Sequence, residues 1–347
     1  MHYDFITIGG ACEDLSIWTD EAVVVKNQKN DKLKERLLGF EYGAKIKVKK
    51  SLSTPGGGAD NAAVALSRLG FRVAILAALG NDERGKKIIK NLRKEGVDTG
   101  LIEVVKNAES GFSPGIVGKD KEHIFFPVRG ANEKLKIHPQ DQKAFKQAKW
   151  LYLTSLSGNW QPELKKIFAV KKIHPVKSPH PRGAAKPQFN RVKIAWNPGG
   201  RQLGSGAQKT IKYFKNTSVL IVNLAEAKEL VYSDKTKHSK TSGWFNNPKN
   251  LAEAINAWGP KIVVITLGSK GAFAYDGKNI YRQSIVKPKK YINTIGVGDA
   301  FGSTFVAGLE LYGGKIKPSL HLAAKNSSAV VAAYGAQTGL LTRKKLL

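Results

Sequence analysis

The chain has very few sulfur-containing residues and no long hydrophobic run. Its 347 residues include one cysteine, Cys12, and one methionine, so the sequence allows neither an internal disulfide nor a zinc site built from several cysteines. No stretch approaches the roughly 18 consecutive apolar residues of a membrane span. The N-terminal residues also lack the basic start and long apolar stretch of a signal peptide. We therefore expect a protein of a reducing, cytoplasmic compartment.

Acidic side chains are scarce in comparison with basic ones. The chain holds 57 Lys and Arg against 27 Asp and Glu, which gives a formal net charge of +30. Such an excess favours nonspecific contact with polyanions, including nucleic acid. The basic residues are scattered along the chain, however, and no RNA-binding aromatic signature accompanies them. We therefore favour a general lysine bias as the source of the charge and keep polyanion binding as the alternative.

Strand-like and helix-like patterns alternate along most of the chain. Short apolar runs rich in β-branched residues predict buried strands, and segments with helical spacing follow them; the predicted strands include 71–79, 150–155, 192–196, 219–222 and 262–267. This alternation is typical of an α/β domain with a doubly wound, mostly parallel sheet. The length suffices for one such large domain, which we expect to span residues 1–347.

Three segments interrupt this alternation. Residues 21–50 are highly charged and weakly periodic, as expected of short strands on a covering flap. The region 110–130 predicts a hairpin that turns at Gly118-Lys119-Asp120. Four of the chain's 14 prolines lie between 175 and 187, so residues 171–191 are expected to form an exposed, poorly ordered loop.

The most informative motif lies near the C-terminal end, at Thr294–Asp299. Two glycines that bracket one residue lead into an apolar run with helical spacing, Ala300–Leu311. A glycine turn that enters a helix points backbone N–H groups at an anion, and the helix dipole adds to this effect. A carboxylate beside a phosphate makes sense if it removes a proton from the hydroxyl that attacks the phosphorus. The motif therefore predicts either an anion hole at Gly296–Gly298 with Asp299 as a base, or an ordinary helix start.

Two polar residues near the N-terminus follow glycines in a similar way. Asp14 comes after a strand that ends in two glycines, which places a carboxylate at the edge of the sheet where open α/β folds bind ligands. Asn61 follows three glycines, Gly56–Gly58, that leave the backbone open to a ligand. Both residues suit the hydroxyl groups of a polyol. A turn aspartate and a helix-capping asparagine are the simpler interpretations.

A third pair of polar residues follows the strand at 219–222. Asn223 and Glu226 are three residues apart, so they share one face of a helix and are able to place oxygen atoms near a magnesium ion or its waters. An ordinary helix cap with Glu in the first turn explains the same spacing.

The order of these motifs is more specific than any one of them. Taken together, the blocks resemble the ribokinase-like carbohydrate kinases of the PfkB family; they are Gly56–Asn61, Gly80–Gly85, Asn223–Glu226, Thr266–Gly271 and Thr294–Asp299. The resemblance covers nearly the whole chain, from Ile6 to Gln337, apart from 171–191. It implies a central, mostly parallel sheet flanked by helices, with a small β-sheet lid formed by about 15–53 and 108–130.

The resemblance also implies the roles of individual residues. The expected catalytic groups are the base Asp299 and an anion hole formed by Gly296, Val297 and Gly298. Substrate hydroxyls are expected to contact Asp14, Gly57, Gly58 and Asn61. The residues expected to bind the nucleotide are Asn223, Thr266, Gly268, Gly271 and Asn326. Glu226 is expected to organise Mg²⁺, in part through water, and a monovalent cation such as K⁺ is a further expected cofactor beside ATP.

The implied function is an ATP- and magnesium-dependent kinase that phosphorylates a sugar hydroxyl. Ribose or a fructose-type sugar is favoured, although Tyr152–Leu156 lacks the acidic residue expected for ribose. The family block also departs at Asn293, where Asp is frequent, and at Val297, where Ala is frequent. An adenosine-type nucleoside kinase, or a basic polyanion-binding protein that retains the kinase fold, is the alternative. A homodimer formed through the lid is also expected.

Overall fold

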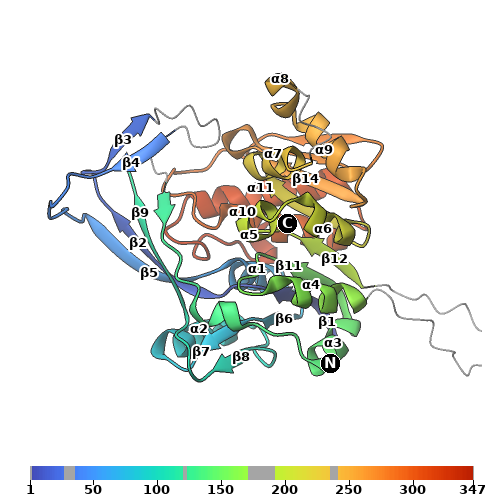
Figure 1. Ribbon diagram of the computed structural model, residues 1–347, viewed down its shortest axis with the longest axis horizontal. Coiled ribbons are helices and arrows are strands. Elements are labelled where there is room, and N and C mark those ends of the chain that lie inside the picture. Colours follow the sequence, from blue (N-terminus) through green and yellow to red (C-terminus); the bar gives the residue numbers. More distant parts are fainter. Residues whose placement is uncertain (1, 27–35, 120–122, 171–191, 235–240, 347) are drawn as a thin grey trace, which may run out of the picture.

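The computed structural model is built on an eight-stranded central sheet (Figure 1). It describes residues 2–26, 36–119, 123–170, 192–234 and 241–346. The strands follow the order β16 (Ile280–Gln283), β15 (Ala272–Tyr275), β14 (Ile262–Thr266), β13 (Val219–Asn223), β12 (Lys193–Trp196), β11 (Ala148–Leu153), β1 (Tyr3–Ile8) and β6 (Val73–Leu76). All neighbours from β14 to β6 are parallel, and β15 and β16 add two antiparallel strands at one edge.

Helices cover both faces of this sheet, which explains why its strands are apolar on both sides. One face packs against α1 (Gly58–Arg68), α2 (Glu83–Lys94), α10 (Val297–Leu311) and α11 (Ile316–Val331). The other packs against α3 (Pro139–Lys146), α4 (Trp160–Ala169), α5 (Gly200–Gly204), α6 (Ala207–Phe214), α7 (Leu224–Tyr232) and α9 (Pro248–Asn256). Successive strand residues alternate between the two cores, as Phe5 and Ile6 do.

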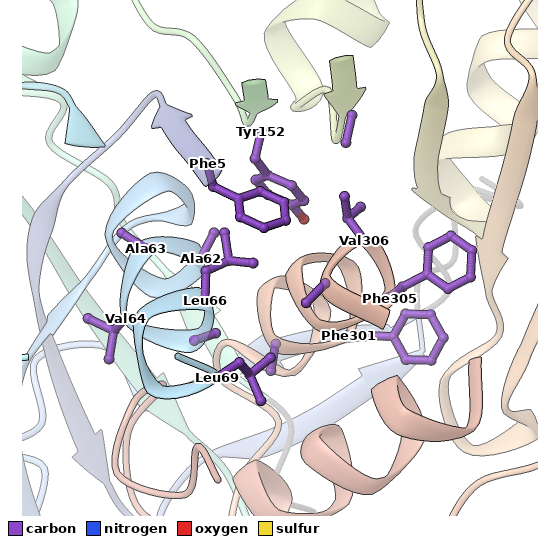
Figure 2. Packing of buried hydrophobic residues seen from close by; sticks show 14 of the residues in the cluster. Phe5, Ala62, Ala63, Val64, Leu66, Leu69, Tyr152, Phe301, Phe305 and Val306 are labelled. Carbon is purple, nitrogen blue, oxygen red and sulfur yellow. The ribbon is translucent and has the colours of Figure 1, made fainter. Parts of the chain in front are cut away.

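Helices α1 and α10 pack against each other and against the middle of the sheet. Figure 2 shows Val306 of α10 and Ala62 of α1 beside Phe5 and Tyr152 of the neighbouring strands β1 and β11. Small residues on α1, including Ala59, Ala62 and Ala63, are fully buried and let the two helices approach closely. This packing fixes the N-terminal ends of α1 and α10 in relation to each other.

A second, four-stranded sheet projects from the main body (Figure 1), with the order β10 (His123–Phe125), β9 (Gly111–Val117), β2 (Cys12–Trp18) and β5 (Lys50–Gly56). We call these four strands the lid sheet. Strands β3 (Val23–Lys26) and β4 (Arg36–Gly39) form an antiparallel pair in the same region. The lid sheet touches the body at the segment before α10, where Val117 packs with Ile295 and Ala336.

The remaining elements are short. Strands β7 (Ala78–Gly80) and β8 (Glu103–Val105) pair in parallel, and the α-helices α8 (Ser242–Phe245) and α12 (Arg343–Leu346) have four residues each. Two 3₁₀ turns lie at Gly130–Lys134 and Gly268–Lys270. Within the described residues, no helix is long and apolar enough to cross a membrane.

The predicted fold class is confirmed, and so is the hairpin at 110–130, which forms β9 and β10. The apolar run Phe71–Leu79 is predicted to form one strand, but its residues belong to two separate strands. Only Val73–Leu76 joins the central sheet, and the chain then turns away so that Ala78–Gly80 pairs with β8. The predicted loop at 171–191 lies outside the described residues.

Candidate active site

Polar side chains from distant parts of the chain meet at the N-terminal ends of α1 and α10. Asn61 of α1 donates a hydrogen bond from Nδ2 to Oδ2 of Asp299 in α10, over 2.8 Å. The two residues are 238 positions apart in sequence, so only the packing of the two helices brings them together. Asp14, on β2 of the lid sheet, is close enough for the charge of Asp299 to affect its ionisation.

Asp299 lies in the first turn of α10, where the helix has no side-chain cap. Gly296 precedes the helix with a left-handed φ of 71°, and a Cβ atom there would come within 2.3 Å of the Ala336 Cβ. Glycine is therefore required at this turn. The Val297 N–H donates a long hydrogen bond of 3.4 Å to the Thr294 carbonyl. The N–H groups of Gly298 and Asp299, in the first turn, have no acceptor in a preceding turn of the helix, so this helix start forms a site for an anion.

Burial raises the pKa of the Asp299 carboxyl, and the hydrogen bond from Asn61 acts in the opposite direction. The Asn61 amide donates a stronger hydrogen bond to the ionised carboxylate than to the protonated carboxyl, so it favours the ionised form. A carboxylate with a raised pKa is a stronger base than one in water. This is the property needed of a group that accepts a proton from a hydroxyl.

Asp14 is 8% exposed and accepts a hydrogen bond from the Cys12 thiol at 3.2 Å. Burial raises the pKa of Asp14 to about 6, and the nearby charge of Asp299 contributes to the rise. A Cβ atom at Gly56, on the paired strand β5, would lie 1.9 Å from the Asp14 Oδ2. The first glycine of the Gly56–Gly58 block therefore makes room for this carboxylate.

The other two glycines of the block have different neighbours. Gly57 has a φ of 96°, and a Cβ atom there would lie 2.5 Å from the carbonyl oxygen of Gly10. Gly58 begins α1, and its backbone passes close to the side chain of Thr154. The backbone of Gly57 and Gly58 thus passes residues that follow the carboxyl ends of β1 and β11 before it enters the helix that carries Asn61.

A pocket of about 460 Å³ lies on the other side of the N-terminal end of α10. Its lining includes four of the residues predicted to bind a nucleotide, namely Asn223, Thr266, Gly268 and Gly271. Val297 and Gly298 of the predicted anion hole also line it. Its walls also include Ile285, Val286, Pro288, Tyr291 and Phe301. None of the described residues that line it carries a charge. The pocket therefore offers apolar side chains that suit a ring, together with backbone N–H groups at the start of α10.

The pair Asn223 and Glu226 forms a helix cap, as the simpler interpretation predicted. Asn223 Oδ1 accepts from the Glu226 N–H at 2.9 Å, and Glu226 Oε2 accepts from the Asn223 N–H at 2.8 Å. Burial raises the pKa of the Glu226 carboxyl, and the charges of Glu229 and Asp299 raise it further. The other carboxyl oxygen of Glu226 has no hydrogen bond with the described residues. The cap thus leaves one oxygen that faces a negatively charged region.

The structure places Asn326 away from the pocket. This residue is fully buried, its Nδ2 donates to Thr304 Oγ1 at 2.8 Å, and its Oδ1 accepts from the Leu341 N–H at 2.9 Å. Both ends of its amide are therefore occupied within the protein, in a structural contact between α10, α11 and the C-terminal segment. The neighbouring residues Ser327 and Ser328 line the pocket instead.

Sequence reasoning missed Gln337, whose amide contacts Asn61, and the wall of the pocket formed by residues 285–291. The wall lies in an irregular segment between β16 and α10, where no periodicity marks the residues that face inward. Its one sequence signal is a short apolar run that includes Tyr291, beside the glycine motif.

A carboxylate and the backbone N–H groups at one helix start, beside an uncharged pocket, suit the transfer of a phosphoryl group to an alcohol. The fold and the site together therefore define a phosphotransferase of the α/β class. Residues 21–343 match the pfkB family of carbohydrate kinases. The chain belongs to this family, and it is a carbohydrate kinase that uses ATP to phosphorylate an alcohol group.

Individual relatives support this assignment. The chain is 27% identical to ribokinase of Bacillus subtilis (strain 168) over 326 residues, which cover 93% of this chain and 94% of that protein. Its fold is similar to that of Arabidopsis thaliana ribokinase complexed with ribose and ATP, with a TM-score of 0.74, 20% identity and coverage of 100% and 98% of the two chains. A nucleoside kinase from Burkholderia thailandensis in complex with inosine has a TM-score of 0.72 and 16% identity, with coverage of 99% of this chain and 96% of that chain.

Proposed function

We propose that this kinase phosphorylates a sugar hydroxyl, with Asp299 as the base that removes the hydroxyl proton. The observation that carries the proposal is the hydrogen bond between Asn61 and Asp299, which joins the predicted sugar side of the site to the predicted anion hole. Asp14 holds and orients the sugar through its carboxylate oxygens. Asn61 contributes the second hydrogen of its amide nitrogen, the first being donated to Asp299. The backbone of Gly57 and Gly58 allows the sugar to approach closely, because it carries no side chains.

In the proposed reaction, the sugar hydroxyl oxygen attacks the γ-phosphorus of ATP and its proton passes to an Asp299 carboxylate oxygen. The bond from the γ-phosphorus to the β–γ bridging oxygen breaks, and ADP leaves. The N–H groups of Val297 and Gly298, at the start of α10, stabilise the negative charge on the transferred group. Gly296 provides the left-handed turn that brings these groups into position.

The nucleotide is proposed to occupy the uncharged pocket. Its base lies against apolar side chains such as Tyr291 and Phe301, and its phosphates point toward the N–H groups at the start of α10. Thr266, Gly268 and Gly271 border the ribose and phosphates. Binding thus depends on shape and backbone N–H groups, because no charged side chain among the described lining residues is available to hold the phosphates.

Mg²⁺ fits the carboxyl oxygen of Glu226 that the helix cap leaves unused, in a group whose pKa the charges of Glu229 and Asp299 raise. Within the described residues there is no cluster of three or more His, Cys, Asp or Glu that could hold a metal. Such an ion is therefore proposed to be held mainly by the nucleotide phosphates and water, and it supplies charge neutralisation there. The K⁺ implied by the resemblance stays a prediction, and no step above depends on it.

Ribose or a fructose-type sugar is the favoured substrate, and a nucleoside is the second candidate because a nucleoside kinase shares the fold. The decisive experiment is a screen of ATP consumption over sugars and nucleosides, with Asp299→Asn as the blank. The proposal is supported if the wild type turns over one sugar and the Asp299→Asn variant does not. If only nucleosides are phosphorylated, the substrate is the second candidate, a nucleoside. No turnover on any alcohol, together with sequence-selective nucleic-acid binding that survives ~0.2 M salt, contradicts the proposal in favour of polyanion binding.

A homodimer is proposed to form through the lid. Strand β3 exposes Val23, Val24 and Val25, each at 46–57%, and the paired strand β4 exposes Leu37 at 48%. An apolar surface of this kind on a two-stranded extension favours contact with another protein surface. Sedimentation of the wild type and of a Val24→Lys variant tests this, and a monomeric wild type would contradict it.

A further inference from the structure

A chain of side-chain amides leads to Asp299 from the side of α1 that faces α2. Gln337 follows α11 and is 7% exposed. Both its amide nitrogen and its amide oxygen form hydrogen bonds within this series of amides. Its Nε2 donates to Asn61 Oδ1 at 3.2 Å and to Asp60 Oδ1 at 2.9 Å. Its Oε1 accepts from Nδ2 of Asn91, in α2, at 3.0 Å. Because Asn61 donates in turn to Asp299, every donor in the chain points toward that carboxylate.

The direction of these hydrogen bonds matters because an amide has two unlike ends. An ionised carboxylate only accepts hydrogen bonds, so Asn61 supports Asp299 only with its NH₂ end. Gln337 selects this orientation, since its Nε2 requires an acceptor and the oxygen of Asn61 provides it. The orientation of Gln337 is selected in the same way, by the acceptor Asp60 on one side and the donor Asn91 on the other.

We propose that Gln337 is a positioning residue for phosphoryl transfer, which fixes the Asn61 amide with its NH₂ group toward Asp299. The proposal rests on the proposed function of Asp299 as the base. Gln337 contacts Asn61 rather than Asp299, so it acts on the reaction only through the orientation of the Asn61 amide. Neighbouring amides in such a chain also polarise one another, which strengthens the last hydrogen bond in it.

The surroundings of Gln337 hold its backbone independently of its side chain. Arg68 NH1 donates to the Gln337 carbonyl at 2.8 Å, and the same guanidinium pairs with Glu95. Asp60 is fully buried, and its Oδ2 has no hydrogen-bond partner among the described residues. The titratable groups around the amide chain are therefore Asp60, Arg68 and Glu95 at the Gln337 end, and Asp14 and Glu226 near Asp299; burial raises the pKa of the Asp60 carboxyl. A change in the Gln337 side chain leaves the anchor at Arg68 in place.

The test is Gln337→Glu, which keeps the shape of the side chain and removes its donor. The new carboxylate faces Asn61 Oδ1, so the Asn61 amide turns over and presents its oxygen to Asp299. We expect kcat to fall about 10- to 100-fold, the effect of losing one hydrogen bond to a charged group. The loss of a donor to the ionised form raises the pKa of Asp299. Since the base must be ionised, the acid limb of the kcat profile moves to higher pH, by about one unit.

Gln202→Glu is the matched control. Gln202 is also fully buried, and its Nε2 donates to the Leu156 carbonyl at 2.6 Å, outside the amide chain. The control is expected to lower stability and to leave the acid limb in place. A second variant, Asp60→Asn combined with Gln337→Glu, replaces the neighbouring carboxylate with an amide that donates to the introduced one. It removes the repulsion between two buried acids, and kcat stays low because Asn61 Oδ1 still lacks its donor.

Each outcome distinguishes this proposal from the function on which it rests. If Asp299→Asn abolishes turnover but both Gln337 variants keep the wild-type kcat and acid limb, the positioning role of Gln337 is wrong. That role is equally wrong if kcat falls by the same factor in Gln202→Glu and no acid limb moves, because the effect is then structural. If Asp299→Asn itself turns over normally, the proposed function fails, whatever the Gln337 variants do.

Discussion

The two sides of the site are built in opposite ways. On the sugar side, Asp14, Asn61 and Asp299 are polar side chains in or near the buried interior, joined by hydrogen bonds and mutual charge effects. On the nucleotide side, the described lining residues are uncharged and supply apolar surface, hydroxyl groups and backbone N–H groups. The contrast is sharp in a chain with a net charge of +30. Under the proposed function, chemistry and sugar recognition depend on a few side chains, whereas nucleotide binding is spread over many weak contacts.

The largest effect is expected at Asp299. Asp299→Asn should lower kcat about 10²- to 10⁴-fold, because it removes a positioned base. The KM for the sugar should change much less, since Asp14 and Asn61 remain. Burial raises the pKa of Asp299, so the neutral amide is not expected to destabilise the fold, and thermal unfolding of the variant provides the control. Near-normal turnover would remove Asp299 from the mechanism.

The next-largest effect is expected at Gly296, and a comparison with Gly298 tests the proposed anion hole. Gly296→Ala introduces a left-handed alanine whose Cβ would lie 2.3 Å from the Ala336 Cβ, so the turn must shift. A displacement of about 1 Å at such a position lowers kcat by about 10²-fold. Gly298→Ala meets no protein atom within 4 Å, so it should keep the stability of the fold and raise the KM for ATP. Equal losses of stability in the two variants would contradict this assignment.

Asp14→Asn is expected to weaken sugar binding about 10- to 100-fold, the range for hydrogen bonds to a charged group. The same change should stabilise the free protein. Burial raises the pKa of Asp14 from 3.8 to about 6, so the folded state binds the proton more tightly than the unfolded state does. The free energy of unfolding of the wild type therefore falls as pH rises from about 4 to about 6, because Asp14 ionises in this range. Above pH 6 the total loss is about 3 kcal/mol.

Denaturant unfolding of Asp14→Asn at two pH values checks this. The gain in the free energy of unfolding over wild type should be present at about pH 8 and absent at about pH 3, where Asp14 is protonated in both states. A gain of the same size at both values would mean that the charge of Asp14 is not its source.

On the nucleotide side, single changes should have small effects. Thr266→Ala removes one hydroxyl from the pocket wall and is expected to raise the KM for ATP by a few-fold, and at most about 10-fold, since a neutral hydrogen bond contributes roughly 0.5–1.5 kcal/mol. The sugar KM should stay unchanged. A loss of about 100-fold at Thr266 would abolish the contrast between the two sides of the site.

The smallest effect concerns the lid sheet. Sugar binding should slow amide exchange in β2, β5 and β9 more than ATP alone does, because Asp14 lies on β2 whereas the nucleotide pocket is lined from the main body. Exchange measured by mass spectrometry with each ligand tests this. Equal protection by the two ligands would show that the lid does not distinguish them.

Much of the framework could be predicted from the sequence, because the order of its motifs is specific. The apolar runs at 219–222 and 262–267 became neighbouring parallel strands, and Asn223 and Thr266 lie where these two strands end at the pocket. The resemblance also assigned complementary roles to Asp299 and Asn61, and the structure places them within hydrogen-bond distance. Their individual roles stay predictions.

The rest depends on tertiary contacts that leave no pattern in the sequence. Gln337 follows a Gly-Ala pair in an irregular segment, and its partner Asn61 is 276 residues away. Asn326 lies at a motif position, yet the C-terminal segment reaches it and occupies its amide. The strand at 71–79 divides because residues after Leu76 find a different partner, β8. In each case the deciding contact comes from a distant part of the chain.

The position of Asp14 has a consequence for the hydrolysis of ATP by water when no sugar is bound. Asp14 lies on the lid sheet, whereas Asn61 and Asp299 lie on the main body. A sugar that bonds to all three ties the two parts together and shields the γ-phosphate from solvent. Water in place of the sugar cannot span them, so it cannot hold the lid sheet down. The residue proposed to recognise the sugar would then also suppress hydrolysis of ATP in the absence of the sugar.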